Sequence, residues 1–188
     1  MPRAIRADAR RNRELLLAAA KEVFAERGAD APLDDVARRA GVGNATMYRH
    51  FPARQELIIA VYSDEVTALC ERGEALLAED PPGDALFAWL EAFVAHVATK
   101  RDLARALTDD RAGRRSALFD GWHEAMRATA SALLDRARRA GAIRTEVEVA
   151  DLLLLANGIA LAGADDVRTR RLIHLIRTGT DRGPGRTI

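Results

Sequence analysis

The stretch from Leu33 to Phe51 constrains the fold of this chain more than any other part of the sequence. It reads L-D-D-V-A-R-R-A-G-V-G-N-A-T-M-Y-R-H-F. The first eight residues place apolar side chains at helical spacing and predict a helix over 33–40. Gly41 follows where a helix C-terminus needs a left-handed residue, a conformation that glycine adopts at little cost. Asn44 is a good N-cap residue, so we predict a second short helix over 44–50 that Asn44 caps.

The predicted second helix has one apolar face and one polar face. Met47 and Phe51 lie one turn apart and are expected to point into the protein. The other face carries hydrogen-bond donors, acceptors and a cation: Asn44, Thr46, Tyr48, Arg49 and His50. A short helix that a glycine turn holds across another helix, with a polar free face, has the geometry that enters the DNA major groove. The stretch therefore predicts a helix-turn-helix that reads DNA.

The pattern A-x-x-A-G-V-x-x-x-T-x-Y-x-H-F over residues 37–51, followed by Pro52, resembles the DNA-binding motif of the TetR (tetracycline-repressor) family of transcriptional regulators. Residues 13–28 are similar to the first helix of that family. The resemblance implies an all-α fold. Its parts would be a three-helix DNA-binding domain with a basic arm at 1–52, a helical ligand-binding and dimerisation domain at 53–180, and a flexible tail at 181–188. It also implies a sequence-specific regulator, most commonly a repressor that a small-molecule ligand releases from its operator.

The same resemblance assigns DNA contacts to particular side chains. Tyr48 and His50 are similar to the phosphate-contacting pair of the family, and a tyrosine hydroxyl and an imidazole N–H can both donate to phosphate oxygens. Asn44 and Arg49 are the candidates for base edges, and the sequence does not decide between them. Further candidates for backbone contact are Thr46, which can also reach a thymine methyl, together with Arg54, Arg10 and Arg11.

Two positions depart from the family pattern. Gly43 stands where many relatives have serine, and Ala45 stands where many have glycine. The missing serine hydroxyl removes a helix cap, which we expect Asn44 to replace. Ala45 leaves less room for close approach of the backbone to DNA. Neither departure breaks the motif.

The N-terminus is basic, and we predict that it forms an arm just ahead of a first helix over 9–27. Asp8 and Glu14 are the local acids that oppose its arginines, which are Arg3, Arg6, Arg10, Arg11 and Arg13. Such an arm taken alone reads as a solvated tail. Beside a helix-turn-helix, contact with DNA phosphates is the better interpretation.

Helical periodicity predicts further helices over 54–78, 84–99, 102–108, 116–140, 147–162 and 167–178. The helix over 147–162 carries four consecutive leucines, so it must be buried on all sides. It is either a purely intramolecular core helix or half of a dimer-forming pair with the last helix. We favour a homodimer, because two recognition helices on a twofold axis can read an inverted repeat in double-stranded DNA. The predicted interface residues are Leu152, Leu155, Ile159, Leu172, Leu175 and Ile176.

By resemblance, the C-terminal domain should hold a small-molecule effector between its helices. The candidate lining mixes apolar bulk with a few polar groups, as ligand sites do. It comprises Trp89, Phe93, His96, Phe119, Trp122, His123, Met126 and Asn157. The alternative for each residue is plain core packing. The histidines do not have metal-ligand spacing, so we predict no metal and no cofactor.

Composition narrows the class of protein further. The 188 residues carry a net charge of +1 and one cysteine, Cys70, which suits a reducing cytoplasm. The longest apolar run, 152–164, is too short to span a bilayer, so we expect no membrane association. No glycine-rich phosphate loop or CxxC motif is present, so we predict that the chain is not an enzyme. The alternatives are a helical ligand-binding protein or enzyme that retains the shape without operator binding, an activator, and a nucleoid-type DNA binder.

Overall fold

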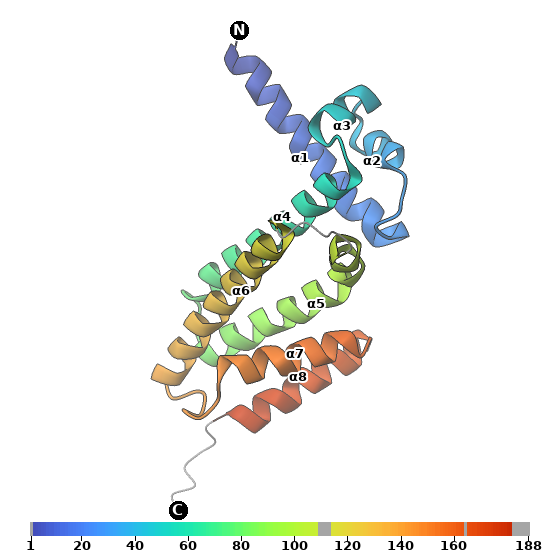
Figure 1. Ribbon diagram of the computed structural model, residues 1–188. Helices are drawn as coiled ribbons and strands as arrows, with labels where there is room; N and C mark the ends of the chain where they lie inside the picture. Colours follow the sequence, from blue (N-terminus) through green and yellow to red (C-terminus); the bar gives the residue numbers. More distant parts are fainter. Residues whose placement is uncertain (1, 109–113, 164, 182–188) are drawn as a thin grey trace, which may run out of the picture. The chain divides into compact units, whose positions relative to one another are not determined.

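A computed structural model describes residues 2–108, 114–163 and 165–181 of the chain, with side chains for 7–99, 118–163 and 165–181. These residues form eight α-helices and no β-strand, so the predicted all-α fold is confirmed (Figure 1). Within the described part, no helix combines the length and the apolar character that crossing a bilayer requires. The helices are α1 (Pro2–Arg27), α2 (Leu33–Ala40), α3 (Asn44–His50), α4 (Arg54–Leu76), α5 (Pro82–Thr108), α6 (Arg114–Arg139), α7 (Val149–Leu161) and α8 (Asp166–Thr180).

The described chain divides into two compact units, and the division falls inside α4, between Asp64 and Glu65. The first unit comprises residues 1–64 and 100–115, and the second comprises 65–99 and 116–188. The predicted domain boundary at 52/53 remains a prediction, because helix α4 belongs to both units.

Helices α1, α2, α3 and the first part of α4 share one apolar core in the first unit. Residues at helical spacing on each helix supply it, as amphipathic helices do. The fully buried side chains of this core include Leu16, Ala20, Val36, Ala37, Met47, Leu57 and Val61. Lys21 on α1 pairs with Asp64 on α4 at 2.6 Å, which adds a surface tie between the same two helices.

The second unit comprises the rest of α4, most of α5 and α6, and all of α7 and α8. Trp89 lies where α4, α5 and α6 meet. The Trp89 indole is fully buried, donates from Nε1 to the Leu69 carbonyl at 3.0 Å, and stacks on Phe93 with ring centroids 5.6 Å apart. Gly73 of α4 faces this cluster closely. A Cβ at Gly73 would lie 2.1 Å from Thr129 Cγ2 and 2.9 Å from Trp89 Nε1. Only glycine therefore fits the point where α4 approaches α5 and α6.

Two predicted helix boundaries are wrong. Helix α1 begins at Pro2, so Arg10 and Arg11 lie within it and not in an arm ahead of it. Proline is tolerated at a helix start, and the Ala- and Arg-rich segment that follows favours helix. The two helices predicted over 84–99 and 102–108 form one helix, α5, because no glycine or proline interrupts residues 84–108.

The remaining helix bounds agree with the predictions to within a few residues. Residues 109–113, between the helices predicted over 102–108 and 116–140, lie outside the described residues. So does the predicted tail, apart from Asp181, whose backbone N–H caps α8 by donating to the Arg177 carbonyl at 2.8 Å.

Candidate nucleic-acid interface

The turn between α2 and α3 has the left-handed glycine that the sequence predicted. Gly41 has φ 66° and ψ 27°, the left-handed conformation that ends α2. Its N–H donates to the Arg38 carbonyl at 3.2 Å, and the Val42 N–H donates to the Ala37 carbonyl at 3.0 Å. These two bonds use carbonyls that the end of α2 leaves unpaired, and they fix the direction in which the chain enters α3.

The predicted N-cap of α3 is wrong. Gly43 occupies that position with extended backbone, φ −65° and ψ 145°, and Asn44 is the first helical residue. The Gly43 carbonyl accepts from the N–H groups of Thr46 and Met47 at 2.8 and 3.0 Å. No side chain caps the helix, so the Asn44 side chain does not replace the missing serine hydroxyl.

Helix α3 has the two faces that the sequence predicted. Met47 and Phe51 are 0% and 3% exposed and anchor the helix in the core of the first unit. Asn44, Tyr48 and Arg49 are exposed, with Tyr48 at 47%, while Thr46 and His50 are half-buried. All five predicted contact residues thus lie on one short helix whose apolar side packs into the core of the first unit. The polar side is free for a partner.

Tyr48 and His50 differ in how the protein already uses their polar atoms. The Tyr48 hydroxyl donates to Asp34 Oδ1, in the first turn of α2, at 3.4 Å. The His50 Nε2 atom is shielded from solvent and has no hydrogen-bond partner among the described residues. A buried imidazole nitrogen without a partner is costly, so a ligand that bonds it is favoured there.

Ion pairs tie α2 to α1 and so support the reading helix. Arg39 of α2 reaches Glu22 and Glu26 of α1, each at 2.9 Å. Arg39 donates hydrogen bonds to Glu26 and Glu22, and these bonds lower the pKa of Glu26 and raise the pKa of Arg39. Arg27 pairs with Asp35 at 2.6 Å. Sequence reasoning missed these acids, because only the packing of α1 against α2 brings residues so distant in sequence together.

Three of the predicted arginines have partners within the protein. Arg54 Nη1 donates to the Ala29 carbonyl at 2.8 Å and to the Ala31 carbonyl, so it holds the α1–α2 loop. The phosphate contact of Arg54 remains a prediction, and its Nη1 is already used within the protein. Arg13 lies over the Phe51 ring, with Cζ 5.7 Å from the centroid, and Arg10 is 3.5 Å from Glu14 on the surface of α1. Arg11 is exposed.

The two parts of the chain match the two parts of one regulator family. Residues 16–61 match the family described as bacterial regulatory proteins, tetR family. Residues 81–181, more than half of the chain, match the family described as transcriptional regulator SbtR-like, C-terminal domain. The chain belongs to the TetR family. The resemblance drawn from residues 13–52 is confirmed, and this TetR-family chain is a DNA-binding transcriptional regulator.

Solved TetR-family structures extend the likeness over nearly the whole chain. A TetR transcriptional regulator from Streptomyces coelicolor is 36% identical with a TM-score of 0.79, covering 92% of this chain and 99% of that one. A TetR transcription regulatory protein from Mycobacterium vanbaalenii is 37% identical with a TM-score of 0.78, covering 94% and 99%. The fold and the order of the two domains are therefore those of the family.

Curated relatives match this chain over about a third of its length or less. The transcriptional activator FasR of Mycolicibacterium smegmatis is 46% identical over 55 residues, which are 29% of this chain and 25% of that protein. The regulator SrpR of Pseudomonas putida is 42% identical over 62 residues, 32% of this chain and 29% of that protein. The chain thus spans less than a third of the length of these two relatives.

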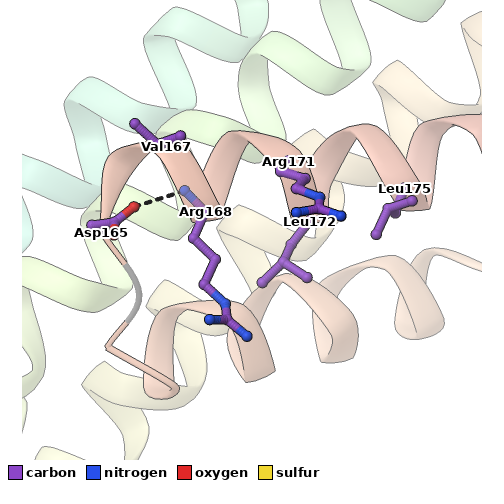
Figure 2. A pocket seen from close by; sticks show the side chains of 6 residues that line it. All are labelled: Asp165, Val167, Arg168, Arg171, Leu172 and Leu175. Atoms are coloured by element: carbon purple, nitrogen blue, oxygen red, sulfur yellow. Dashed lines mark hydrogen bonds between the residues drawn. The ribbon is translucent and has the colours of Figure 1, made fainter.

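The predicted effector residues lie in the second unit, in three different environments. Trp89, Phe93, His96 and Met126 are buried in its core. Phe119 and Trp122 are half-buried and meet edge to face with centroids 5.2 Å apart, and Asn157 is also half-buried. His123 is exposed. A cavity of about 500 Å³ lies elsewhere, on α8, and none of the eight residues lines it (Figure 2).

The predicted dimer residues divide between core and surface. Leu152 and Ile159 are buried inside the unit, so their assignment to an interface is wrong. Leu155 and Leu175 are more than half exposed, and Leu172 and Ile176 are half-buried. Three other large apolar side chains are exposed on α7 and α8: Leu154, Leu161 and Val167. We call the exposed residues Leu154, Leu155, Leu161, Val167 and Leu175 the α7–α8 apolar face.

The cavity on α8 belongs to the same helix pair. Its lining comes from α8 and its N-cap: Asp165, Val167, Arg168, Arg171, Leu172 and Leu175 (Figure 2). Asp165 caps α8 by accepting from the Arg168 backbone N–H at 2.8 Å. The depression therefore lies at the start of α8 and includes two members of the α7–α8 apolar face.

Proposed function

We propose that this TetR-family chain is a homodimeric repressor that binds an inverted-repeat operator in the cytoplasm and leaves it when a small molecule binds the second unit. The observation that carries the proposal is the division of α3. Met47 and Phe51 are buried, while Asn44, Tyr48 and Arg49 are exposed beside the half-buried His50. This pattern suits a helix that is held by its protein on one side and by DNA on the other.

The polar side chains of α3 have distinct proposed roles. Tyr48 and His50 donate to phosphates and set the register of the helix on the duplex. His50 Nε2 has no partner among the described residues but is shielded from solvent, so the ring must turn outward to donate to a phosphate oxygen. Asn44 and Arg49 are exposed and can pair with adenine or guanine in two-bond contacts. Thr46, half-buried, meets a phosphate or a thymine methyl, and the exposed Arg11 meets the backbone from α1.

Dimerisation follows from the size of the reading surface and from the α7–α8 apolar face. One seven-residue helix makes too few contacts for operator specificity, and a twofold axis doubles them. Leu154 and Val167 are 71% and 72% exposed, unusual for large aliphatic side chains of a folded chain. A second copy seated on the α7–α8 apolar face would remove these side chains from water.

The effector is proposed to bind in the second unit among the aromatic residues Trp89, Phe93, Phe119 and Trp122, with Asn157 as a polar contact. A ligand there releases DNA only if it binds the DNA-incompetent shape more tightly than the competent one. Thermal unfolding of the chain with and without candidate compounds, followed by operator binding, would identify an effector by its effect on both.

The DNA contacts are tested by operator affinity after Tyr48→Phe and His50→Ala. Each change removes a hydrogen bond to a charged acceptor, worth about 1.5–3 kcal/mol at most, once in each half-site. We expect a loss of affinity of roughly tenfold or more for each variant. The operator is first found by footprinting on fragments of the parent genome, and affinities are then measured across a salt series.

Tyr62→Phe is the matched control. Tyr62 lies on α4 in the same compact unit but is 7% exposed, so its hydroxyl does not face a duplex. The control should keep wild-type affinity. If Tyr48→Phe and His50→Ala also keep it, these two residues do not contact DNA and the proposed interface is wrong.

Activation is the second candidate for the direction of regulation. A stretch of 55 residues of the chain is 46% identical to a protein named as a transcriptional activator, and the same DNA contacts serve either outcome. A reporter gene behind the footprinted site separates the two. Deletion of the regulator raises expression if it represses and lowers expression if it activates.

A further inference from the structure

An acidic side chain touches the proposed phosphate-contacting tyrosine. Asp34 Oδ1 accepts from the Tyr48 hydroxyl at 3.4 Å, although the two residues are on different helices. Both side chains are exposed, and both lie in the compact unit that carries α3. The side of α3 that is proposed to meet DNA thus includes a carboxylate from α2.

None of the described cations pairs with the carboxylate of Asp34. In the described part of the chain, Asp34 forms no ion pair, whereas the adjacent Asp35 pairs with both Arg27 and Arg38. Both acids lie in the first turn of α2, where the helix dipole stabilises a negative charge, so they differ mainly in the direction of their side chains. Asp35 faces arginines of the first unit, and Asp34 faces the tyrosine.

The contact limits how far Asp34 can be from a bound phosphate. A phosphate oxygen that accepts from the Tyr48 hydroxyl lies at about 2.7 Å from it. With 3.4 Å between the hydroxyl and Asp34 Oδ1, that oxygen is within about 6 Å of the carboxylate. Two like charges at this separation in water repel enough to reduce an affinity roughly threefold, and two half-sites give about tenfold.

We propose that Asp34 is a built-in brake on DNA binding. In the free protein its carboxylate holds the Tyr48 hydroxyl, and on DNA it repels the phosphate that takes over that hydroxyl. Asp34 is therefore a positioning residue that lowers affinity for any duplex, operator or not, because a phosphate carries no sequence information. The inference rests on the proposed phosphate contact of Tyr48.

The test is Asp34→Asn in the full-length chain, with affinity measured for the footprinted operator and for an unrelated duplex of equal length. Asparagine keeps an acceptor for Tyr48 and removes only the charge. We expect about tenfold tighter binding to both duplexes at low salt, and a gain that shrinks as salt rises, since salt screens exposed charges. Asp34→Ala, which also removes the acceptor, should give a similar gain.

Glu71→Gln controls for net charge. Glu71 is an exposed residue of α4 in the other compact unit, so its loss should leave both affinities nearly unchanged. The thermal unfolding midpoint of each variant checks that the fold is intact.

The brake is wrong if Asp34→Asn leaves binding unchanged or weakens it for both duplexes. It is also wrong if binding weakens for the operator alone, because the carboxylate then reads a base. These results are separable from failure of the proposed interface. In that case Tyr48→Phe and His50→Ala would leave affinity unchanged, whatever Asp34→Asn does.

Discussion

Replacing Gly73 by alanine should destabilise the second unit through a single added methyl group. The new Cβ would lie 2.1 Å from Thr129 Cγ2 and 2.9 Å from Trp89 Nε1. Thr129 cannot easily turn away, since its hydroxyl donates to the Ala125 carbonyl at 3.0 Å. Trp89 is fully buried, and its Nε1 is committed to the Leu69 carbonyl. Both neighbours of the added methyl are therefore held in place.

The magnitude follows from opposing effects. Overpacking a core costs about 1–3 kcal/mol. Disturbing the buried Trp89 hydrogen bond adds about 1–3 kcal/mol. Against this, alanine is favoured over glycine in a helix by about 1 kcal/mol. We expect the free energy of unfolding to fall by about 1–5 kcal/mol, measured by urea denaturation followed by far-UV circular dichroism.

Two variants decide whether the clash is the cause. Thr129→Ser removes the clashing methyl and keeps the hydroxyl, so it should recover about 1–2 kcal/mol in the Gly73→Ala background. Gly121→Ala places a Cβ on α6 with no neighbour within 4 Å, and it should stabilise the chain slightly. If Gly73→Ala is as stable as wild type, α4 does not approach Thr129 and Trp89 this closely.

Two further predictions concern the interfaces. Leu154→Glu and Leu175→Glu should each convert the proposed dimer to a monomer in sedimentation equilibrium and abolish operator binding at nanomolar protein. The control is Leu118→Glu, at a leucine of α6 that is 45% exposed, and it should leave the dimer intact. A dimer that survives both changes would place its interface elsewhere. Arg54→Met should lower the free energy of unfolding by about 1–3 kcal/mol, because two loop carbonyls lose their donor, yet leave the salt dependence of DNA binding unchanged. A shallower dependence, by about 0.9 for each phosphate that the variant no longer neutralises, would restore the phosphate role that the sequence suggested for Arg54.

The reading helix was the part most readily predicted from sequence. Helices α2 and α3 have the predicted bounds, 33–40 and 44–50, because Gly41 marks the turn chemically and Met47 and Phe51 mark the buried face. The N-cap of α3 was predicted wrongly. Asparagine is a common N-cap residue, so the sequence favoured Asn44, whereas Gly43 holds that position and its carbonyl accepts the first helical hydrogen bonds. Local propensity fixed the type of element but not its first residue.

Other features needed the fold. Residues 152–155 are all leucine, so the sequence cannot tell which of them faces the core. The packing of the helices decides that Leu152 is buried and Leu154 is exposed. The role of Arg54 depends on carbonyls more than twenty residues away in sequence. Likewise, the contact of Asp34 with Tyr48 arises from the crossing of two helices, which no spacing rule describes.

Helix α3 is only seven residues long, far below the length at which a helix is stable in water by itself. A synthetic peptide of this sequence would not keep its shape, so the reading surface cannot be transplanted without its frame. The transplantable part is smaller: the outward side chains at 44, 45 and 49 can be exchanged while Met47, Phe51 and the proposed phosphate contact Tyr48 stay. An engineer who wishes to redirect this regulator to a new promoter would therefore randomise those three positions and leave the others alone.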